Sequence, residues 1–194
     1  MTPTSPAPHS IRGEPSPWIT RWAHLLQPAC SVLDVACGAG RHAAFFAQRG
    51  HAVTGLDRDI GGLQDLAHLV TLVQADIENG PWPLKADGNT TQFQAVVVTN
   101  YLWRRLLPTL IASLSPGGVL LYETFTIGNE SVGRPSRPDF LLRPGELLEV
   151  CKSFHIVGYE CGYLDNPPRF VQRIAAIQPR LSQQTDDSPV RYPL

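Results

Sequence analysis

The sequence lacks a surplus of charge of either sign. Its 194 residues include 16 Lys and Arg against 17 Asp and Glu, which leaves a formal net charge of −1 at pH 7. Proteins that bind nucleic acid or membrane surfaces through bulk charge are strongly basic. We therefore expect neither a dedicated nucleic-acid-binding protein nor a membrane-surface protein, although a local basic patch would not show in these totals.

Cysteine is scarce and scattered. The four cysteines are Cys30, Cys37, Cys151 and Cys161. They form no C-x-x-C pair, and no histidine stands at the spacing that zinc sites use. We expect reduced thiols and no metal site.

Long apolar runs are also missing. No stretch approaches the roughly 20 apolar residues that span a bilayer. The N-terminal sequence MTPTSPAPHSIRGEPSP lacks the apolar core of a signal peptide. We therefore expect a cytoplasmic protein with no membrane partner, and the oligomeric state stays open.

Both ends of the chain are rich in Pro and polar residues. Large apolar side chains are too few there to offset the entropy lost on ordering the chain. We predict disordered tails at residues 1–16 and 179–194. Between them lies a single domain over residues 17–178, a length that one hydrophobic core can serve.

Within this domain, short β-like runs alternate with longer helical ones. The candidate strands are 31–36, 52–56, 71–75, 93–99 and 118–124. The candidate helices are 40–49, 59–67, 103–114 and 143–151. Several strands are continuously apolar, as strands buried on both faces are. The alternation predicts an α/β protein with a doubly wound, mostly parallel sheet.

Three local signals refine this prediction. Asp59 is a suitable N-cap for the second helix, and Pro108 should either kink the third helix or mark its true beginning. The final runs, 154–164 and 169–177, are separated by an Asp-Asn-Pro-Pro turn. They predict an antiparallel hairpin added to the edge of the sheet.

The segment VLDVACGAGRHA, from Val32 to Ala43, contains the most informative pattern. An apolar strand ends beside Asp34, and the chain then turns through Gly38 and Gly40 into a helix. Glycine suits such a turn because a ligand approaches the backbone closely there and because φ can be positive.

Two classes of ligand fit this turn. Gly38, Gly40 and Ala43 match G-x-G-x-x-[G/A], and Asp57 follows at the distance of a ribose-binding acid, so NAD is one candidate. Asp34, however, would repel a pyrophosphate and attract an ammonium or sulfonium cation. We favour a cationic ligand and keep an NAD-binding oxidoreductase as an alternative.

Two further acids stand at strand ends, Asp57 in VTGLD and Asp76 in LVQAD. An ionised Asp57 can accept hydrogen bonds from both ribose hydroxyls. Asp76 and Ile77 suit the amine and the ring face of an adenine. Gly38, Asp57 and Asp76 are spaced 19 residues apart, about one strand–helix unit, so they should line one edge of the sheet.

Together, the segments VLDVACGAG, VTGLD, VQADIENGPWPL and FQAVVVTNYL resemble the successive motifs of class I S-adenosylmethionine-dependent methyltransferases. The resemblance covers nearly all of the predicted domain. It implies a Rossmann-like methyltransferase fold and S-adenosylmethionine as the cofactor. The sequence Gly40-Arg41-His42 further resembles small tellurite-resistance-type methyltransferases.

The resemblance also implies which residues bind the cofactor. The methionine end would face Asp34 and the Gly38–Gly40 turn, the ribose Asp57, and the adenine Asp76 and Ile77. The backbone around Thr99 and Asn100 would lie near the reacting sulfonium. The complete implied set is Asp34, Ala36, Gly38, Gly40, Asp57, Arg58, Asp76, Ile77 and Thr99.

Two segments depart from the family pattern. Thr99-Asn100-Tyr101-Leu102 is not the Asp/Asn-Pro-Pro-Tyr motif with which amino-methylating DNA and protein enzymes hold an amine. This difference disfavours methylation of nucleic-acid bases. The loop at 124–142 is long and rich in Gly and Pro; loops of this length are usually functional, but the sequence does not give its role.

Methyl transfer from a sulfonium is an in-line displacement, so positioning of the acceptor matters most. A general base is needed only for an acceptor that arrives protonated. Asn100, Tyr101 and Glu123 are the candidate catalytic residues, and His42 is a weaker candidate base.

The acceptor itself is not identified by the sequence. We expect a small molecule, because the predicted domain is compact and nearly neutral. An RNA or protein acceptor is the alternative. It would be favoured if the fold clusters Arg104, Arg105, Arg134 and Arg137.

Overall fold

The computed structural model describes residues 12–180 and 191–194. The strands of its main sheet are β1 (Ser31–Val35), β2 (Ala52–Asp57), β3 (Val70–Gln74), β6 (Phe93–Thr99), β7 (Leu114–Phe125), β8 (His155–Asp165) and β9 (Pro168–Ile177). Their order is β3-β2-β1-β6-β7-β9-β8. From β3 to β7 neighbouring strands are parallel, and β9 is antiparallel to both β7 and β8.

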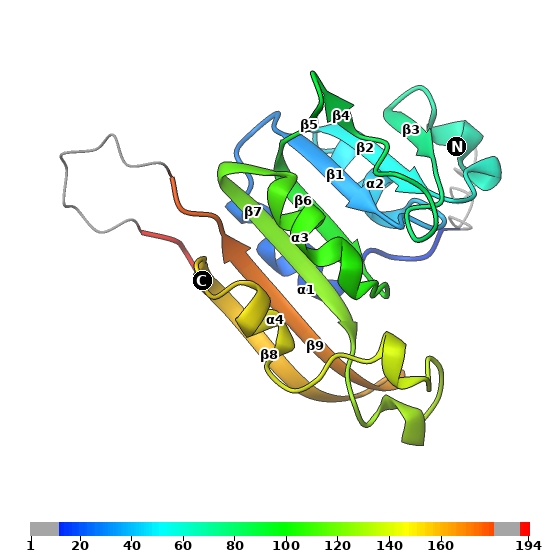
Figure 1. The fold of residues 1–194 in the computed structure, drawn as a ribbon, viewed down its shortest axis with the longest axis vertical. Helices are drawn as coiled ribbons and strands as arrows, with labels where there is room; N and C mark the ends of the chain where they lie inside the picture. The colour runs from blue at the N-terminus through cyan, green and yellow to red at the C-terminus, as the bar shows by residue number, and fades with distance from the viewer. Residues whose placement is uncertain (1–11, 181–190) are drawn as a thin grey trace, which may run out of the picture.

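Short helices cover both faces of this sheet. They are α1 (Pro17–Trp22), α2 (Arg41–Ala47), α3 (Leu107–Ala112) and α4 (Glu146–Val150), with 3-10 turns η1 (Ala23–Leu25), η2 (Gly61–Leu66), η3 (Arg104–Leu106), η4 (Asn129–Ser131) and η5 (Pro138–Phe140). Buried side chains of α1, α2 and η2 join one core cluster, and those of α3 and α4 join the other. Figure 1 shows α3 and α4 on one face of the sheet and α1 on the other. The predicted doubly wound α/β fold, with its C-terminal antiparallel hairpin, is confirmed.

The continuous apolar runs form strands because both of their faces are buried. In β6, Ala95 and Val97 face the α1–α2 side, whereas Val96 and Val98 face the α3–α4 side. All four side chains are fully buried. Burial on two faces explains the absence of polar alternation in this strand. A small hairpin, β4 (Lys85–Ala86) and β5 (Asn89–Thr90), was not predicted.

The predicted helix at 59–67 is a 3-10 helix, Gly61–Leu66, and not an α-helix. Gly61 and Gly62 lower the helix propensity of the segment, which explains the difference. The prediction of Asp59 as its N-cap is wrong, since the N-cap is Ile60; Asp59 precedes it, and its Oδ1 accepts a hydrogen bond from the Gly61 N–H at 2.9 Å.

The predicted helix at 103–114 is divided. Residues Arg104–Leu106 form a 3-10 turn, and α3 follows with Pro108 in its first turn. Proline is tolerated at that position because its missing N–H would have no partner there. Pro108 therefore marks the beginning of the α-helix.

The N-terminal helix α1 is an element that the sequence analysis missed. Ser16 caps it, with its Oγ accepting from the Trp18 N–H at 3.1 Å, and Pro17 is the first helical residue. Trp18 and Trp22 are both 2% exposed. The combination Ser-Pro before an apolar run is a helix-start signal.

The structure describes only part of the two predicted tails, residues 12–16, 179–180 and 191–194. Residues 1–11 and 181–190 lie outside the described residues, so for them disorder stays a prediction. Within the other tail residues, Ser16 is buried, Arg12 pairs with Asp65, and the Tyr192 ring lies 4.7 Å from that of His155. These contacts extend the folded region beyond residues 17–178. Among the described residues, no helix has the length and apolarity needed to cross a bilayer.

Helix α1 fixes the outer part of the sheet through one close contact. Gly158 of β8 lies against Trp22, and a Cβ added at Gly158 would be 2.4 Å from Trp22 Cζ2. Gly162, on the same strand, has no atom within 4 Å of such a Cβ.

We therefore expect Gly158→Ala to destabilise the fold, whereas Gly162→Ala leaves it nearly unchanged. Overpacking of this kind costs about 1–3 kcal/mol. Thermal unfolding should show a melting temperature lower by roughly 2–10 °C for Gly158→Ala. Equal melting temperatures for the two variants would contradict the contact between α1 and β8.

Candidate functional site

The parallel strands bring the predicted site residues to one edge of the sheet. Asp34 in β1 is in register with Gly55 of β2 and Val97 of β6. At the tips of β6 and β7, Thr99 is in register with Glu123. The carboxyl ends of parallel strands are where open α/β sheets bind ligands.

The turn after β1 has a backbone that favours glycine. Gly38 and Gly40 have φ of 54° and 76°, and Ala36 also has a positive φ, of 52°. At Gly40 an added Cβ would lie 2.8 Å from Leu66 Cδ1, so packing against η2 requires glycine. At Gly38 no atom lies within 4 Å of an added Cβ. The backbone at Gly38 thus faces open space that a ligand can occupy.

Asp57 connects this turn to the end of β2. Its Oδ2 accepts from the Gly38 N–H at 2.8 Å, and its Oδ1 accepts from the Asp59 N–H at 3.0 Å. These two bonds hold the carboxylate at the sheet edge. Each oxygen keeps acceptor capacity for a ligand.

A cavity of about 410 Å³ opens beside Asp57. It is lined by Ala36, Asp57, Arg58, Ala75, Asp76, Ile77, Glu78, Asn79 and Tyr101. Its size lies within the range of small-molecule sites. Five predicted cofactor residues and Tyr101 line it; Asp34, Gly38, Gly40, Thr99, Asn100 and Glu123 are not among its lining residues.

Three lining residues, Ala75, Glu78 and Asn79, are not predicted from the sequence. Asp76 Oδ1 accepts from the Glu78 and Asn79 N–H groups at 3.0 and 3.1 Å, and its Oδ2 accepts from Asn79 Nδ2 at 2.9 Å. These bonds lower the pKa of Asp76, with that of the Asn79 side chain acting most strongly. An Asp that bonds to the backbone after it is a known turn signal, which could have pointed to this loop.

Asp34 is a buried carboxyl group at this edge, only 1% exposed. Neither of its oxygens is within normal hydrogen-bond geometry of a described residue. Burial raises its pKa to about 7, and the Ala43 N–H and the charge of Arg41 offset only part of that rise. A buried carboxyl group without a partner is costly, and a cationic ligand group would relieve that cost.

Tyr101 lines the cavity, and its buried hydroxyl keeps its proton. Burial raises its pKa most, and the carboxylates of Glu78, Asp76 and Asp57 raise it further. A phenol in this state donates a hydrogen bond and does not take up a proton at neutral pH. Asn100, the residue before it, has a φ of 54°, and its N–H donates to the Glu123 carbonyl at 2.9 Å.

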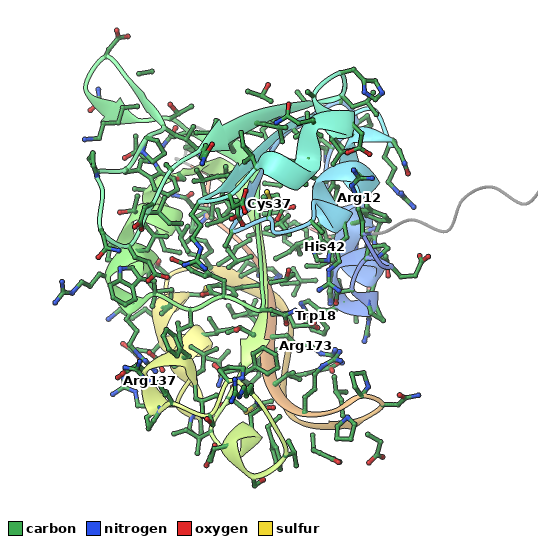
Figure 2. The ribbon with its side chains drawn as sticks, turned by 90° about the vertical axis from the view of Figure 1, so that its right-hand side faces the viewer. Arg12, Trp18, Cys37, His42, Arg137 and Arg173 are labelled. Carbon is green, nitrogen blue, oxygen red and sulfur yellow. The ribbon has the colours of Figure 1, made fainter. Side chains whose placement is uncertain are left out.

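Glu123 is held in a buried network. Its Oε1 accepts from Ser16 Oγ at 3.0 Å and its Oε2 from Arg173 Nη1 at 3.1 Å. The Arg173 guanidinium lies 4.8 Å over the Trp18 ring (Figure 2). Glu123 is 2% exposed, so the described contacts give it a role in joining α1 to the sheet.

His42 is buried beneath the same N-terminal segment. The Ser16 N–H donates to its Nε2 at 3.0 Å, and its Nδ1 lies 3.3 Å from Thr99 Oγ1. Burial, aided by the charge of Arg41, lowers its pKa to about 3. Because Nε2 accepts a bond, the neutral ring carries its proton on Nδ1 and donates to Thr99.

Three of the four arginines named from the sequence do come together. Arg104, Arg105 and Arg137 line a second cavity of about 330 Å³, and Arg134 is not among its lining residues. Within residues 12–180 and 191–194, no three His, Cys, Asp or Glu side chains converge in the way that a metal site requires. The four cysteines are free thiols.

The match to a known family model spans the chain from β1 to the early residues of β7. Residues 32–118 match the family model described as a methyltransferase domain. A malonyl-[acyl-carrier protein] O-methyltransferase from Serratia marcescens is 33% identical over 111 residues, which cover 53% of this chain and 41% of that protein. The chain thus spans less than half the length of this relative.

Solved structures share the fold. TehB from Haemophilus influenzae has a TM-score of 0.64 at 21% identity, covering 82% of this chain and 61% of that chain. A SAM-dependent methyltransferase from Methanosarcina mazei has a TM-score of 0.63 at 16% identity, covering 87% and 100%. The architecture described above is therefore the Rossmann-like fold that such methyltransferases have.

The raised pKa of Asp34 predicts a pH-dependent cost to stability. This cost is absent below about pH 4, where Asp34 is protonated in both the folded and the unfolded protein. It grows as the pH rises from about 4 to about 7, because only the unfolded protein ionises this group readily over that range. Asp34→Asn removes the charge and keeps the shape of the side chain. At neutral pH its free energy of unfolding should therefore exceed that of the wild type by up to about 4 kcal/mol.

Urea unfolding of both proteins at pH 4.5 and pH 7.5 measures this difference. The gap between Asp34→Asn and wild type should be small at the lower pH and large at the higher one. A gap that does not depend on pH would show that Asp34 is already ionised at low pH in the folded protein.

Proposed function

We propose that the chain transfers a methyl group from S-adenosylmethionine to a small-molecule acceptor, because residues 32–118 match a methyltransferase-domain model and the fold is shared with S-adenosylmethionine-dependent methyltransferases. The observation that carries the proposal is the cavity at the strand tips, with Asp57 fixed at its wall by the Gly38 N–H. A nucleoside-sized ligand fits a cavity of this volume.

The residues present suit this cofactor. We assign Asp57 to the ribose hydroxyls, with Arg58 beside it, and Asp76 and Ile77 to the adenine. The open backbone at Gly38 leaves room for the methionine part. The buried, unpaired Asp34 carboxyl lies at the same edge of the sheet, where a cationic group of the ligand would favour its ionised form. Thr99, Ala36 and Gly40 shape the surrounding backbone.

S-adenosylmethionine, when bound, would supply an electrophilic methyl group on its sulfonium sulfur; as an acceptor lone pair attacks the methyl carbon, the carbon–sulfur bond breaks and S-adenosylhomocysteine is the leaving group. The chain has to position the acceptor in line and exclude water. Tyr101, at the cavity wall, can donate a hydrogen bond to the acceptor. We place Asn100 at the turn that positions Tyr101.

None of the three candidate bases has the properties of a free base. Tyr101 holds its proton, His42 has both ring nitrogens engaged, and both Glu123 oxygens accept hydrogen bonds. This favours an acceptor whose nucleophilic atom already has a free lone pair at neutral pH, such as a carboxylate.

Calorimetry with S-adenosylhomocysteine, the stable product, tests the cofactor. We expect micromolar binding of S-adenosylhomocysteine and none of NAD. Binding of NAD alone would replace the proposal with the oxidoreductase alternative.

Asp57→Asn tests the ribose assignment. Loss of the charged acceptor should weaken S-adenosylhomocysteine by about tenfold or more. Asp59→Asn is the matched control, because Asp59 also accepts a backbone N–H but is not among the residues that line the cavity. Equal affinities for the wild type and Asp57→Asn would refute the assignment of Asp57.

A further inference from the structure

We propose that the cavity lined by Arg105 and Arg137 binds an anionic group of the methyl acceptor, and that the acceptor is a small molecule in which a carboxylate or phosphate is attached to a flat, apolar body. This inference rests on the proposed function and names the chemistry of its acceptor. The cavity is distinct from the one that we assign to the cofactor, since the two share no lining residue.

The two cavities have lining residues that are close in the sequence. Its wall begins at Trp103, two residues after Tyr101, which lines the cofactor cavity. Its other wall comes from the loop after β7, which also starts at the carboxyl edge of the sheet (Figure 1). Both walls therefore come from the edge at which the methyl group would be presented.

The loop wall is fixed and does not depend on a ligand. Thr126 and Leu142 close its base: Thr126 Oγ1 donates to the Leu142 carbonyl at 2.7 Å, and the Ile127 N–H donates to the same carbonyl at 3.0 Å. Asn129, 1% exposed, accepts from the Phe170 N–H at 3.1 Å and donates to the Pro135 carbonyl at 3.0 Å. A preformed wall lowers the entropic cost of binding.

Arg104 joins the two walls. Its Nε and Nη2 donate to the two Glu146 carboxylate oxygens at 2.7 and 2.9 Å, and its Nη1 and Nη2 donate to the carbonyls of Asp139 and Leu141. Glu146 thus neutralises the charge of Arg104, and the guanidinium is engaged in holding the loop. Arg104 shapes the cavity and does not supply its free charge.

The positive charge available to a ligand comes from Arg105 and Arg137. Arg105 is exposed and has no ion pair among the described residues. Arg137 pairs with Asp139 at 3.0 Å, in an exposed contact that a ligand anion can replace. Glu146 offsets the charge of Arg104. The charges of the other two arginines are therefore opposed by one carboxylate in the lining, that of Asp139. The cavity keeps a surplus of positive charge.

Aromatic rings supply the apolar part. Trp103 and Phe140 line the cavity, and the Arg137 guanidinium lies 5.3 Å over the Phe140 ring. Aromatic faces pack against flat ligands, and the planar guanidinium fork matches carboxylate or phosphate oxygens in pairs. In Figure 2, Arg137 lies at the opposite end of the view from Arg12 and the N-terminal segment. A positive rim on aromatic walls selects a flat anion over a neutral or cationic acceptor.

The test uses three probes: trans-cinnamate, its neutral analogue cinnamamide, and phenyl phosphate. Each is titrated calorimetrically into the full chain, which has first been titrated with S-adenosylhomocysteine. We expect trans-cinnamate or phenyl phosphate to bind at least about tenfold more tightly than cinnamamide, and their order identifies the anion. If S-adenosylhomocysteine does not bind, that result counts against the proposed function alone. The probes are then titrated into the chain without it, and their affinities still test the anion site.

Variants locate the binding. Arg105→Gln and Arg137→Gln should each weaken the anionic probe by about tenfold, with no change for cinnamamide or S-adenosylhomocysteine. Arg134→Gln, an exposed arginine of the same loop outside the cavity lining, is the matched control and should bind like wild type. Equal binding of cinnamate and cinnamamide, no binding of any probe, or the same loss in Arg134→Gln would overturn the inference.

Discussion

The parallel pairing of β1, β2, β3, β6 and β7 is the constraint on which the rest of the structure depends. Parallel strands that are buried on both faces leave polar side chains few positions except at their ends. Because all five strands run in one direction, these ends meet at a single edge. The glycine turn after β1, the acids after β2 and β3, and the arginines after β6 are neighbours for this reason alone.

At that edge the structure carries local costs. Ala36 and Asn100, both at strand tips, have φ values that favour glycine, and Asp34 keeps an unpaired carboxyl in an apolar surrounding. Such strain and unpaired charge persist only where neighbouring structure enforces them, and they concentrate at functional sites. Ala36 lines the cavity beside Asp57, and such costs are typical of a site shaped for a ligand rather than for stability.

The sequence was sufficient to predict the strands, the edge and the order of its acids, because continuous apolar runs and strand-end aspartates are local signals. It did not reveal the partners of Glu123. Ser16 lies 107 residues from Glu123, and Arg173 lies 50 residues from it. Contacts of that separation depend on topology, which also brings Arg137 to Arg105. Helix α1 is not predicted for a different reason: its Ser-Pro start adjoins a segment rich in Ser and Pro, a composition typical of a disordered tail.

The place of β9 has a consequence for how the chain acquires its structure. This last strand lies between β7 and β8, and within the described residues β8 pairs with no other strand of the sheet. During synthesis β8 therefore leaves the ribosome without a partner, and the sheet closes only after Ile177 has emerged. Pairing of the two outer strands is therefore expected to follow that of β1, β2, β3, β6 and β7 during synthesis.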